Sequence, residues 1–214
     1  MYKAILFDLD GTLTDTLADI AHAMNRALRL HGLPEWPQDA YRYLVGNGAK
    51  VLAERCVRER QELAEDVRRT YQAYYQEHSL VRTKPYDGVC DMLQALERQG
   101  LRLAVLSNKP DADTKRVVSH FFPGTRFEVV RGQIEGVAVK PDPAGALATA
   151  RQMGLAPEKF LYLGDTAVDM QTALAAGMHP VGALWGFRTE EELRHSGAEF
   201  VAEMPMDVLK FTHM

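Results

Sequence analysis

The feature that most constrains the fold is an alternation of short β-rich runs with helical segments over the second half of the chain. Four runs are typical of strands: "LAVLS" (103–107), "FEVVR" (127–131), "FLYLG" (160–164) and "PVGAL" (180–184). Helical patterns accompany them, as in residues 88–99. Such alternation predicts right-handed βαβ units around a largely parallel sheet. The expected fold class is therefore α/β, a Rossmann-like parallel sheet with helices on both faces.

A further strand is predicted at "AILF" (4–7). It lies far along the sequence from the other strand-like runs with which it could pair. Residues 16–31 and 38–78 instead carry apolar side chains at helical spacing, with no strand-like run between them. We expect residues 4–7 to join the main sheet. Residues 16–80 then form an inserted all-helical cap domain, and residues 1–15 and 81–214 form the α/β core domain.

Composition excludes several classes of protein. The formal net charge of -4 over 214 residues gives no basic footprint, so nucleic acid is not an expected partner. No apolar run approaches the roughly 18 residues of a membrane span, and the first residues lack a signal-peptide layout, so we expect a cytoplasmic protein that uses no membrane. Either a monomer or a homodimer is compatible with the sequence. Neither Cys56 nor Cys90 has the arginine of a cysteine-based phosphatase six positions on.

Polar residues follow the apolar runs at the points where ligands bind in an open parallel sheet, outside the carboxyl ends of the strands. Asp8 and Asp10 are two residues apart, so a strand would place them on one side, where their charges repel. A metal ion, a nearby cation or a retained proton must compensate. The full set is Asp8, Asp10, Gly11 and Thr12 after 4–7, Ser107 and Asn108 after "LAVL", Lys140 after "EGVAV", and Asp165 and Asp169 after "FLYLG". Together they predict one shared site.

These segments resemble the motifs of a known family over essentially the whole chain. "DLDGTLTDT", "SNK", "KPDP" and "GDTAVD" are similar to the four motifs of the haloacid dehalogenase superfamily. Within it, "VGNGAKVLAER" and "YLGDTAVDMQTALAAGM" resemble the phosphoglycolate phosphatase branch, which carries a helical cap after the first strand.

The resemblance implies a role for each residue of the site. Asp8 would attack phosphorus to form an aspartyl phosphate, and Asp10 would serve as general acid and base. Lys140 would balance charge on Asp8 and the phosphoryl group, and Asp169 would hold Lys140 or a metal-bound water. The implied cofactor is Mg2+, bound by the side chains of Asp8 and Asp165 and the main-chain oxygen of Asp10. Gly11, Thr12, Ser107 and Asn108 would surround the phosphate.

The expected function is a magnesium-dependent phosphomonoester hydrolase acting on a small phosphorylated metabolite, with 2-phosphoglycolate as first choice. The alternatives are a hexose phosphate mutase of the same superfamily, a phosphatase for pyrophosphate or an amino-sugar 6-phosphate, and a non-catalytic binding module. In the cap, the loop before the helix that begins near Gly48 offers free N–H groups, which favour an anion such as a substrate carboxylate. Its candidate binding residues are Gly46, Asn47, Gly48 and Lys50.

Overall fold

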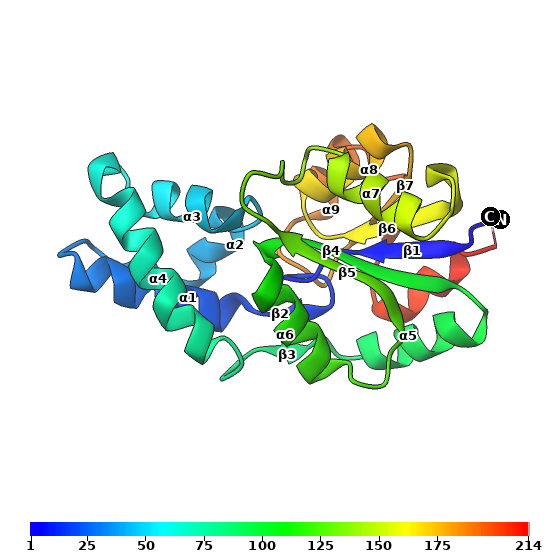
Figure 1. Cartoon of the computed structure of the whole chain (residues 1–214), viewed down its shortest axis with the longest axis horizontal. Helices are drawn as coiled ribbons and strands as arrows, with labels where there is room; N and C mark the ends of the chain where they lie inside the picture. Colours follow the sequence, from blue (N-terminus) through cyan, green and yellow to red (C-terminus); the bar gives the residue numbers. More distant parts are fainter. Residues whose placement is uncertain (214) are drawn as a thin grey trace.

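The computed structural model describes residues 1–213 and shows an α/β core joined to a helical lobe (Figure 1). The core holds a six-stranded sheet whose paired strands all run parallel, in the order β5-β4-β1-β6-β7-β8. The strands are β1 (Ala4–Phe7), β4 (Arg102–Pro110), β5 (Phe127–Gln133), β6 (Phe160–Gly164), β7 (His179–Ala183) and β8 (Phe200–Ala202). The predicted fold class is therefore confirmed, with β1 between β4 and β6.

All five predicted strands are present, and β8 is an additional edge strand that the sequence analysis missed. The run "EGVAV" (135–139) is a correction, because it forms loop rather than strand. Lys140 therefore reaches the sheet from the loop that follows β5, not from the end of a strand. Its composition is typical of a strand, but among the described residues it pairs with no strand of the sheet.

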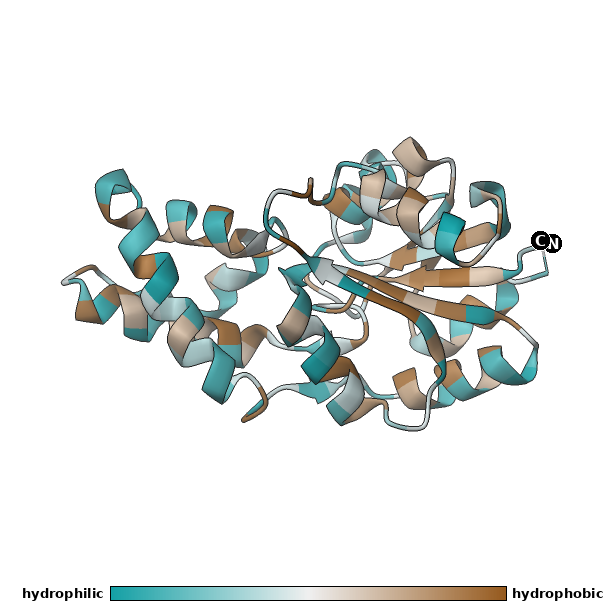
Figure 2. Cartoon of the chain, viewed as in Figure 1, coloured by the Kyte–Doolittle hydropathy of each residue, from teal (hydrophilic) through white to brown (hydrophobic). Residues whose placement is uncertain are grey.

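The strands of the sheet are largely hydrophobic (Figure 2), and the alternation of side chains along each strand sorts them onto two faces. Ile5 and Phe7 of β1 pack in one buried cluster with α5 (Val89–Arg98) and α6 (Asp111–Phe121). Ala4 and Leu6 face the opposite way, toward α7 (Ala144–Gln152) and α8 (Ala167–Ala176). The remaining core helices are α9 (Glu190–His195) and the 3-10 segments Pro157–Lys159 and Pro205–Lys210. Helices thus cover both faces of the sheet.

The helical lobe has a buried cluster of its own, to which Phe187 is the one core contributor among the buried residues described. Its helices are α1 (Leu17–Leu30), α2 (Tyr41–Leu44), α3 (Gly48–Cys56) and α4 (Ala64–His78), with 3-10 turns at Gln38–Ala40 and Gln61–Leu63. In α4 the buried stripe consists of Val67, Tyr71 and Tyr75, whereas Tyr74 is only partly buried. We keep residues 16–80 as the proposed cap.

The two chain segments that join cap to core lie side by side. A short antiparallel pair, β2 (Thr14–Asp15) and β3 (Lys84–Pro85), brings them together. Asp19, at the start of α1, accepts hydrogen bonds from the backbone and the hydroxyl of Thr83, both at 2.9 Å. These contacts fix the start of α1, where the chain enters the proposed cap, beside the sheet.

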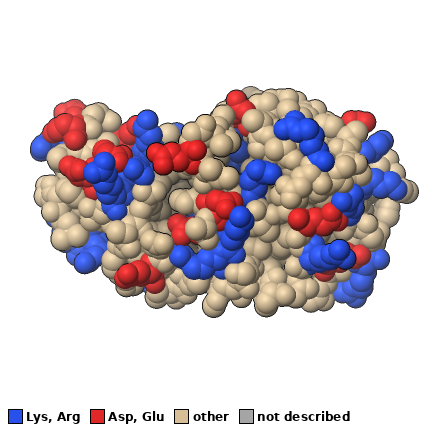
Figure 3. Space-filling model, viewed as in Figure 1, with Lys and Arg blue, Asp and Glu red and all other residues tan. Residues whose placement is uncertain are grey.

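Over residues 1–213, no helix combines the length and the apolar composition that a membrane crossing needs. Acidic and basic side chains are intermixed on the face shown in Figure 3.

Candidate active site

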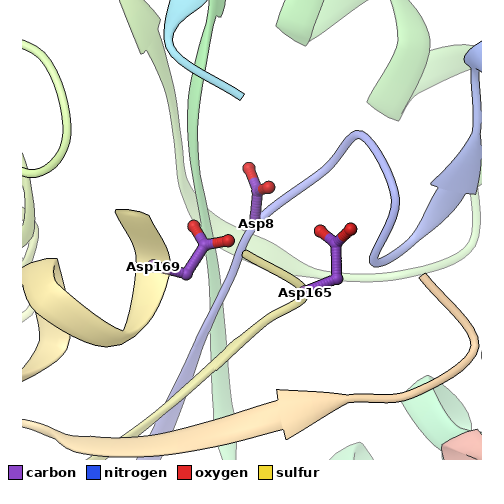
Figure 4. A group of neighbouring side chains, drawn as sticks. All are labelled: Asp8, Asp165 and Asp169. Atoms are coloured by element: carbon purple, nitrogen blue, oxygen red, sulfur yellow. The ribbon is translucent and has the colours of Figure 1, made fainter. Parts of the chain in front are cut away.

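Three carboxylates meet at the carboxyl edge of the sheet (Figure 4). Asp8 follows β1, Asp165 follows the neighbouring β6, and Asp169 lies in the first turn of α8. Each offers an oxygen that lies within 4.8 Å of the other two, and all three side chains are buried. Parallel pairing of β1 with β6 brings the first two together, as the sequence analysis expected.

Lys140 supplies a positive charge to this cluster. Its Nζ lies 2.8 Å from Oδ1 of Asp8 and 2.6 Å from Oδ1 of Asp169. The other oxygen of Asp169 accepts hydrogen bonds from the backbone and hydroxyl of Thr166, which caps α8. Asp169 therefore holds Lys140 against Asp8, which is the arrangement predicted for it.

The charges of this cluster balance only with a retained proton or a further cation. Burial raises the pKa of Asp8 to about 7, and the negative charge of Asp169 adds to that effect. Burial likewise raises the pKa of Asp165 well above its usual range. One lysine faces three buried carboxylates, so a divalent cation with oxygen ligands would relieve the repulsion. Asp8 and Asp165 fit as its side-chain ligands, since Asp169 is committed to Lys140 and Thr166.

Asp10 is held by a second lysine, which the sequence analysis did not single out. Nζ of Lys109 lies 2.8 Å from Oδ2 of Asp10 and 2.9 Å from the hydroxyl of Tyr75. Oδ1 of Asp10 is buried and has no hydrogen-bond partner among residues 1–213. Lys109 completes the "SNK" segment at the end of β4, so its position in that motif was the signal that could have identified it.

Thr12 and Gly11 both lie against Asp165. The hydroxyl of Thr12 donates to Oδ1 of Asp165 at 3.0 Å, and the residue is fully buried. Gly11 has a φ of +92°, and a Cβ there would collide with the Asp165 carboxylate. Neither residue lines the cavity described below.

The side-chain amide of Asn108 is engaged by the protein itself. Its Oδ1 accepts from the backbone N–H of Lys140 at 2.9 Å, and its Nδ2 donates to the Lys140 carbonyl at 3.0 Å. The same Nδ2 donates to the carbonyl of Gly46 in the cap at 3.0 Å. Asn108 thus positions Lys140 and the cap loop, and it also lines the cavity described below.

A cavity of about 60 Å³ lies between the carboxylates and the cap. On the core side the lining includes Asp8, Asp10, Ser107, Asn108, Lys109 and Lys140, and on the cap side it includes Ile20, Gly46, Gly48, Ala49, Leu52, Tyr71, Gln72 and Tyr75. Besides Gly11 and Thr12, two cap residues predicted to bind substrate lie outside the cavity. Lys50 is exposed, and the side-chain oxygen of Asn47 accepts from Arg55 at 2.9 Å.

A loop after β7, residues 184–189, connects the carboxylates to the cap, and the sequence analysis missed it. The backbone N–H of Phe187 donates to Oδ2 of Asp165 at 2.8 Å, while its ring packs in the cap cluster. Arg188 donates to the carbonyl of Val45, and Arg42 of the cap donates to the carbonyl of Gly186, each at 3.2 Å. These long-range contacts carry no local sequence signal.

Comparison with known proteins agrees with this geometry. The family model described as haloacid dehalogenase-like hydrolase matches residues 5–183. A phosphoglycolate phosphatase from Aquifex aeolicus is 33% identical over 208 residues, covering 97% of this chain and 95% of the relative. An N-acetylmuramic acid 6-phosphate phosphatase from Pseudomonas aeruginosa is 31% identical over 211 residues, covering 97% and 93%. The crystal structure of a predicted phosphoglycolate phosphatase from Haemophilus somnus superposes with a TM-score of 0.91 at 30% identity, covering 99% of this chain and 98% of that one.

The chain belongs to the haloacid dehalogenase-like hydrolase family. Within that family it lies in the phosphoglycolate phosphatase-like branch, and it is a phosphatase.

Proposed function

We propose that the protein is a magnesium-dependent phosphomonoester hydrolase that acts on 2-phosphoglycolate through an aspartyl-phosphate intermediate. The observation that carries this proposal is the pairing of each aspartate of the first motif with its own lysine at one small cavity. Asp8 lies against Lys140 and Asp10 against Lys109, at 2.8 Å in both cases. The two carboxylates therefore have separate surroundings, which suits two separate roles.

The first role is that of nucleophile. An oxygen of Asp8 would form a bond to phosphorus while the bond from phosphorus to the ester oxygen breaks. Lys140 would balance the charge that collects on Asp8 and the phosphoryl oxygens, with Asp169 holding its ammonium in place. Mg2+ bound at Asp8 and Asp165 would supply further charge neutralisation. Ser107, at the cavity wall, offers a hydroxyl to the phosphoryl oxygens.

The second role is proton transfer. Asp10 would give a proton to the departing ester oxygen and then take one from the water that hydrolyses the aspartyl phosphate. General acid-base catalysis of this kind is typically worth about 10²–10⁴-fold in rate. The unpartnered Oδ1 of Asp10 is the atom available for both transfers.

The size of the cavity supports a small substrate. The space between the carboxylates and the cap measures about 60 Å³. That room suits a two-carbon phosphate ester better than a phosphorylated sugar. The cap contributes no cationic side chain to the described lining, so the backbone N–H groups at the start of α3, beside Gly48 and Ala49, are our candidates for the substrate carboxylate.

A second candidate substrate is N-acetylmuramic acid 6-phosphate. The relative from Pseudomonas aeruginosa that carries this name is similar to the present chain over 97% of its length. N-acetylmuramic acid 6-phosphate would require the cap to lie further from the core than the cap does in this structure, since the cavity is small.

A substrate panel tests both candidates. Purified protein would be assayed on 2-phosphoglycolate, N-acetylmuramic acid 6-phosphate, pyrophosphate and a hexose 1-phosphate, with Mg2+ and with chelator. We expect the highest kcat/KM on 2-phosphoglycolate and loss of turnover in chelator. A preference for the amino sugar, or isomerised sugar phosphate as product, would replace our proposal with the corresponding alternative. Turnover that persists in chelator would refute the metal dependence.

A further inference from the structure

We propose that Lys109 and Tyr75 are positioning residues that fix Asp10 for proton transfer only when the cap lies on the core. The inference rests on the proposed function and adds to it two residues and a dependence on the cap. It concerns one chain of contacts, from Asp10 through the Lys109 ammonium to the Tyr75 hydroxyl.

The Lys109 ammonium occupies one side of the Asp10 carboxylate. Its contact is with Oδ2, at 2.8 Å, and the lysine side chain is only 4% exposed. Oδ1 of the same carboxylate is buried and has no partner in the part of the chain that the structure describes. An ion pair at one oxygen restricts the rotation of the carboxylate, so Lys109 selects Oδ1 as the atom that meets the substrate.

Tyr75 holds the lysine from the other side. Its hydroxyl lies 2.9 Å from the Lys109 ammonium, which also lies 4.8 Å from the centre of the Tyr75 ring. Tyr71, one helical turn earlier, stacks on Tyr75 with ring centres 5.3 Å apart. Because the Tyr75 side chain is buried, it has little freedom to change its rotamer, and its hydroxyl stays where it contacts the Lys109 ammonium.

The three residues come from both parts of the molecule. Asp10 and Lys109 belong to the core, whereas Tyr75 lies in α4 of the proposed cap. If the cap moves away, Lys109 loses its tyrosine partner and Asp10 loses the restraint that fixes its rotamer. The acid would then be in place only over an enclosed substrate.

The chemistry defines which step should depend on this chain. In the first step the bond from Asp8 to phosphorus forms, the bond to the ester oxygen breaks, and the proton of Asp10 moves to that oxygen. An alkoxide leaves poorly without this proton, but p-nitrophenolate is stable enough to leave without it. In the second step Asp10 accepts a proton from water for every substrate, because the aspartyl phosphate is the same.

Three substrates and one variant therefore test the proposal. We would measure Lys109→Met on 2-phosphoglycolate, on 2-hydroxyethyl phosphate and on p-nitrophenyl phosphate, in rapid-mixing and steady-state experiments with Mg2+. The second compound keeps the alkyl leaving group but carries no carboxylate. Lys159→Met, at an exposed position outside the cavity, is the matched control for charge and side-chain length.

We expect Lys109→Met to lower kcat on both alkyl phosphates by about 100-fold, the lower end of the range for general acid-base catalysis. On p-nitrophenyl phosphate we expect a burst of nitrophenolate near one equivalent per enzyme, at a rate within threefold of wild type. Slow turnover should follow, because the second step still needs Asp10. Lys159→Met should match wild type on all three compounds.

Other patterns overturn the proposal. A loss confined to 2-phosphoglycolate would assign Lys109 to carboxylate recognition, and an equal loss of the first turnover on all three would assign it to phosphate binding or folding. Failure of the proposed function would instead be visible in the wild type, as poor hydrolysis of 2-phosphoglycolate. The comparison of variants would still be made on 2-hydroxyethyl phosphate.

Tyr75→Phe provides a milder second variant in case Lys109→Met does not fold. It removes one hydroxyl and keeps the ring, so we expect alkyl phosphate turnover to fall about three- to tenfold with the same nitrophenolate burst. Tyr74→Phe, one residue away, is its control, since the Tyr74 hydroxyl contacts His22 instead. Unchanged alkyl phosphate turnover in Tyr75→Phe would refute the role of the cap in positioning Asp10.

Discussion

The side-chain amide of Asn108 forms hydrogen bonds with both the N–H and the carbonyl of Lys140. It accepts from the Lys140 N–H at 2.9 Å and donates to the Lys140 carbonyl at 3.0 Å. Lys140 lies in a loop. These two hydrogen bonds therefore take the place of the backbone hydrogen bonds between strands that would fix a residue at a strand end. The same amide also donates a hydrogen bond to the carbonyl of Gly46, so Asn108 connects Lys140 to the cap.

Asn108→Asp should therefore impair both catalysis and stability. The change exchanges a donor for an oxygen that faces the carbonyls of Gly46 and Lys140. We expect a loss of about 1–3 kcal/mol in the free energy of unfolding and a fall in kcat of at least tenfold. Denaturant melts and steady-state kinetics measure the two effects. Wild-type kcat in Asn108→Asp would show that Lys140 is held well enough by Asp8 and Asp169 alone.

Asp8→Asn should abolish turnover and leave the fold intact. The variant removes the nucleophile but also one of three carboxylates that share a buried site. Steady-state assays should show less than a thousandth of wild-type activity, a change of about 4 kcal/mol in the barrier. Activity above that level in a clean preparation would exclude a covalent intermediate on Asp8.

The pH dependence of stability should change in the same variant. In metal-free protein, burial raises the pKa of Asp8 to about 7 from its ordinary value of 3.8. Folding then binds a proton between these values, so the Asp8 contribution to stability is full below about pH 4 and is lost as pH rises through 7. Thermal melts in chelator should fall less steeply across this window in Asp8→Asn than in wild type. Parallel curves would show that the Asp8 pKa is ordinary.

Mg2+ should raise the melting temperature of the wild-type protein, because the ion binds the folded carboxylate site. At a concentration of 100 times Kd the stabilisation is about 2.7 kcal/mol. Asp165→Asn should abolish the shift while it retains the acceptor for Thr12. Glu128→Gln, which removes an acid that pairs with Arg102 at the sheet edge, should keep the full shift. An undiminished shift in Asp165→Asn would refute the ligand assignment.

The anion site at the start of α3 can be tested at Ala49. Gly48 itself has a φ of +83°, which proline cannot adopt, so a substitution there would distort the loop. Ala49→Pro removes one N–H from the first turn, where proline is tolerated. We expect kcat/KM for 2-phosphoglycolate to fall at least tenfold and that for p-nitrophenyl phosphate to stay within threefold. Ala112→Pro, in the first turn of α6, is the control. Equal losses on both substrates would leave the N-terminus of α3 without a role in specificity.

The sheet and the carboxylate cluster could be predicted because their signals are local. Strand-like runs and the polar residues that end them lie next to each other in the chain, and parallel pairing then gathers their carboxyl ends. The roles of Thr12 and Asn108 could not be predicted in the same way. Each depends on a partner far along the chain, Asp165 for the first and Gly46 and Lys140 for the second.

In the cap, helical periodicity gave the helices but not the side chains that face the core. Tyr74 and Tyr75 both fit an apolar stripe in sequence, and only the packing of α4 on α1 and α3 decides between them. The same limit applies to Lys109, since a lysine after a strand is most often solvated. Its burial depends on Asp10 and Tyr75 together.

Phe187 connects the cap cluster directly to Asp165, the carboxylate that we propose as a metal ligand. Its ring is anchored among cap side chains, and its N–H fixes one oxygen of Asp165. A cap that swings open with this ring in place pulls on the amide that orients Asp165. A cap that leaves the ring behind exposes an apolar side chain to water. An opening of the proposed cap would therefore disturb the proposed metal ligand or cost hydrophobic contact, so the state of the cap and the geometry of Asp165 would be coupled.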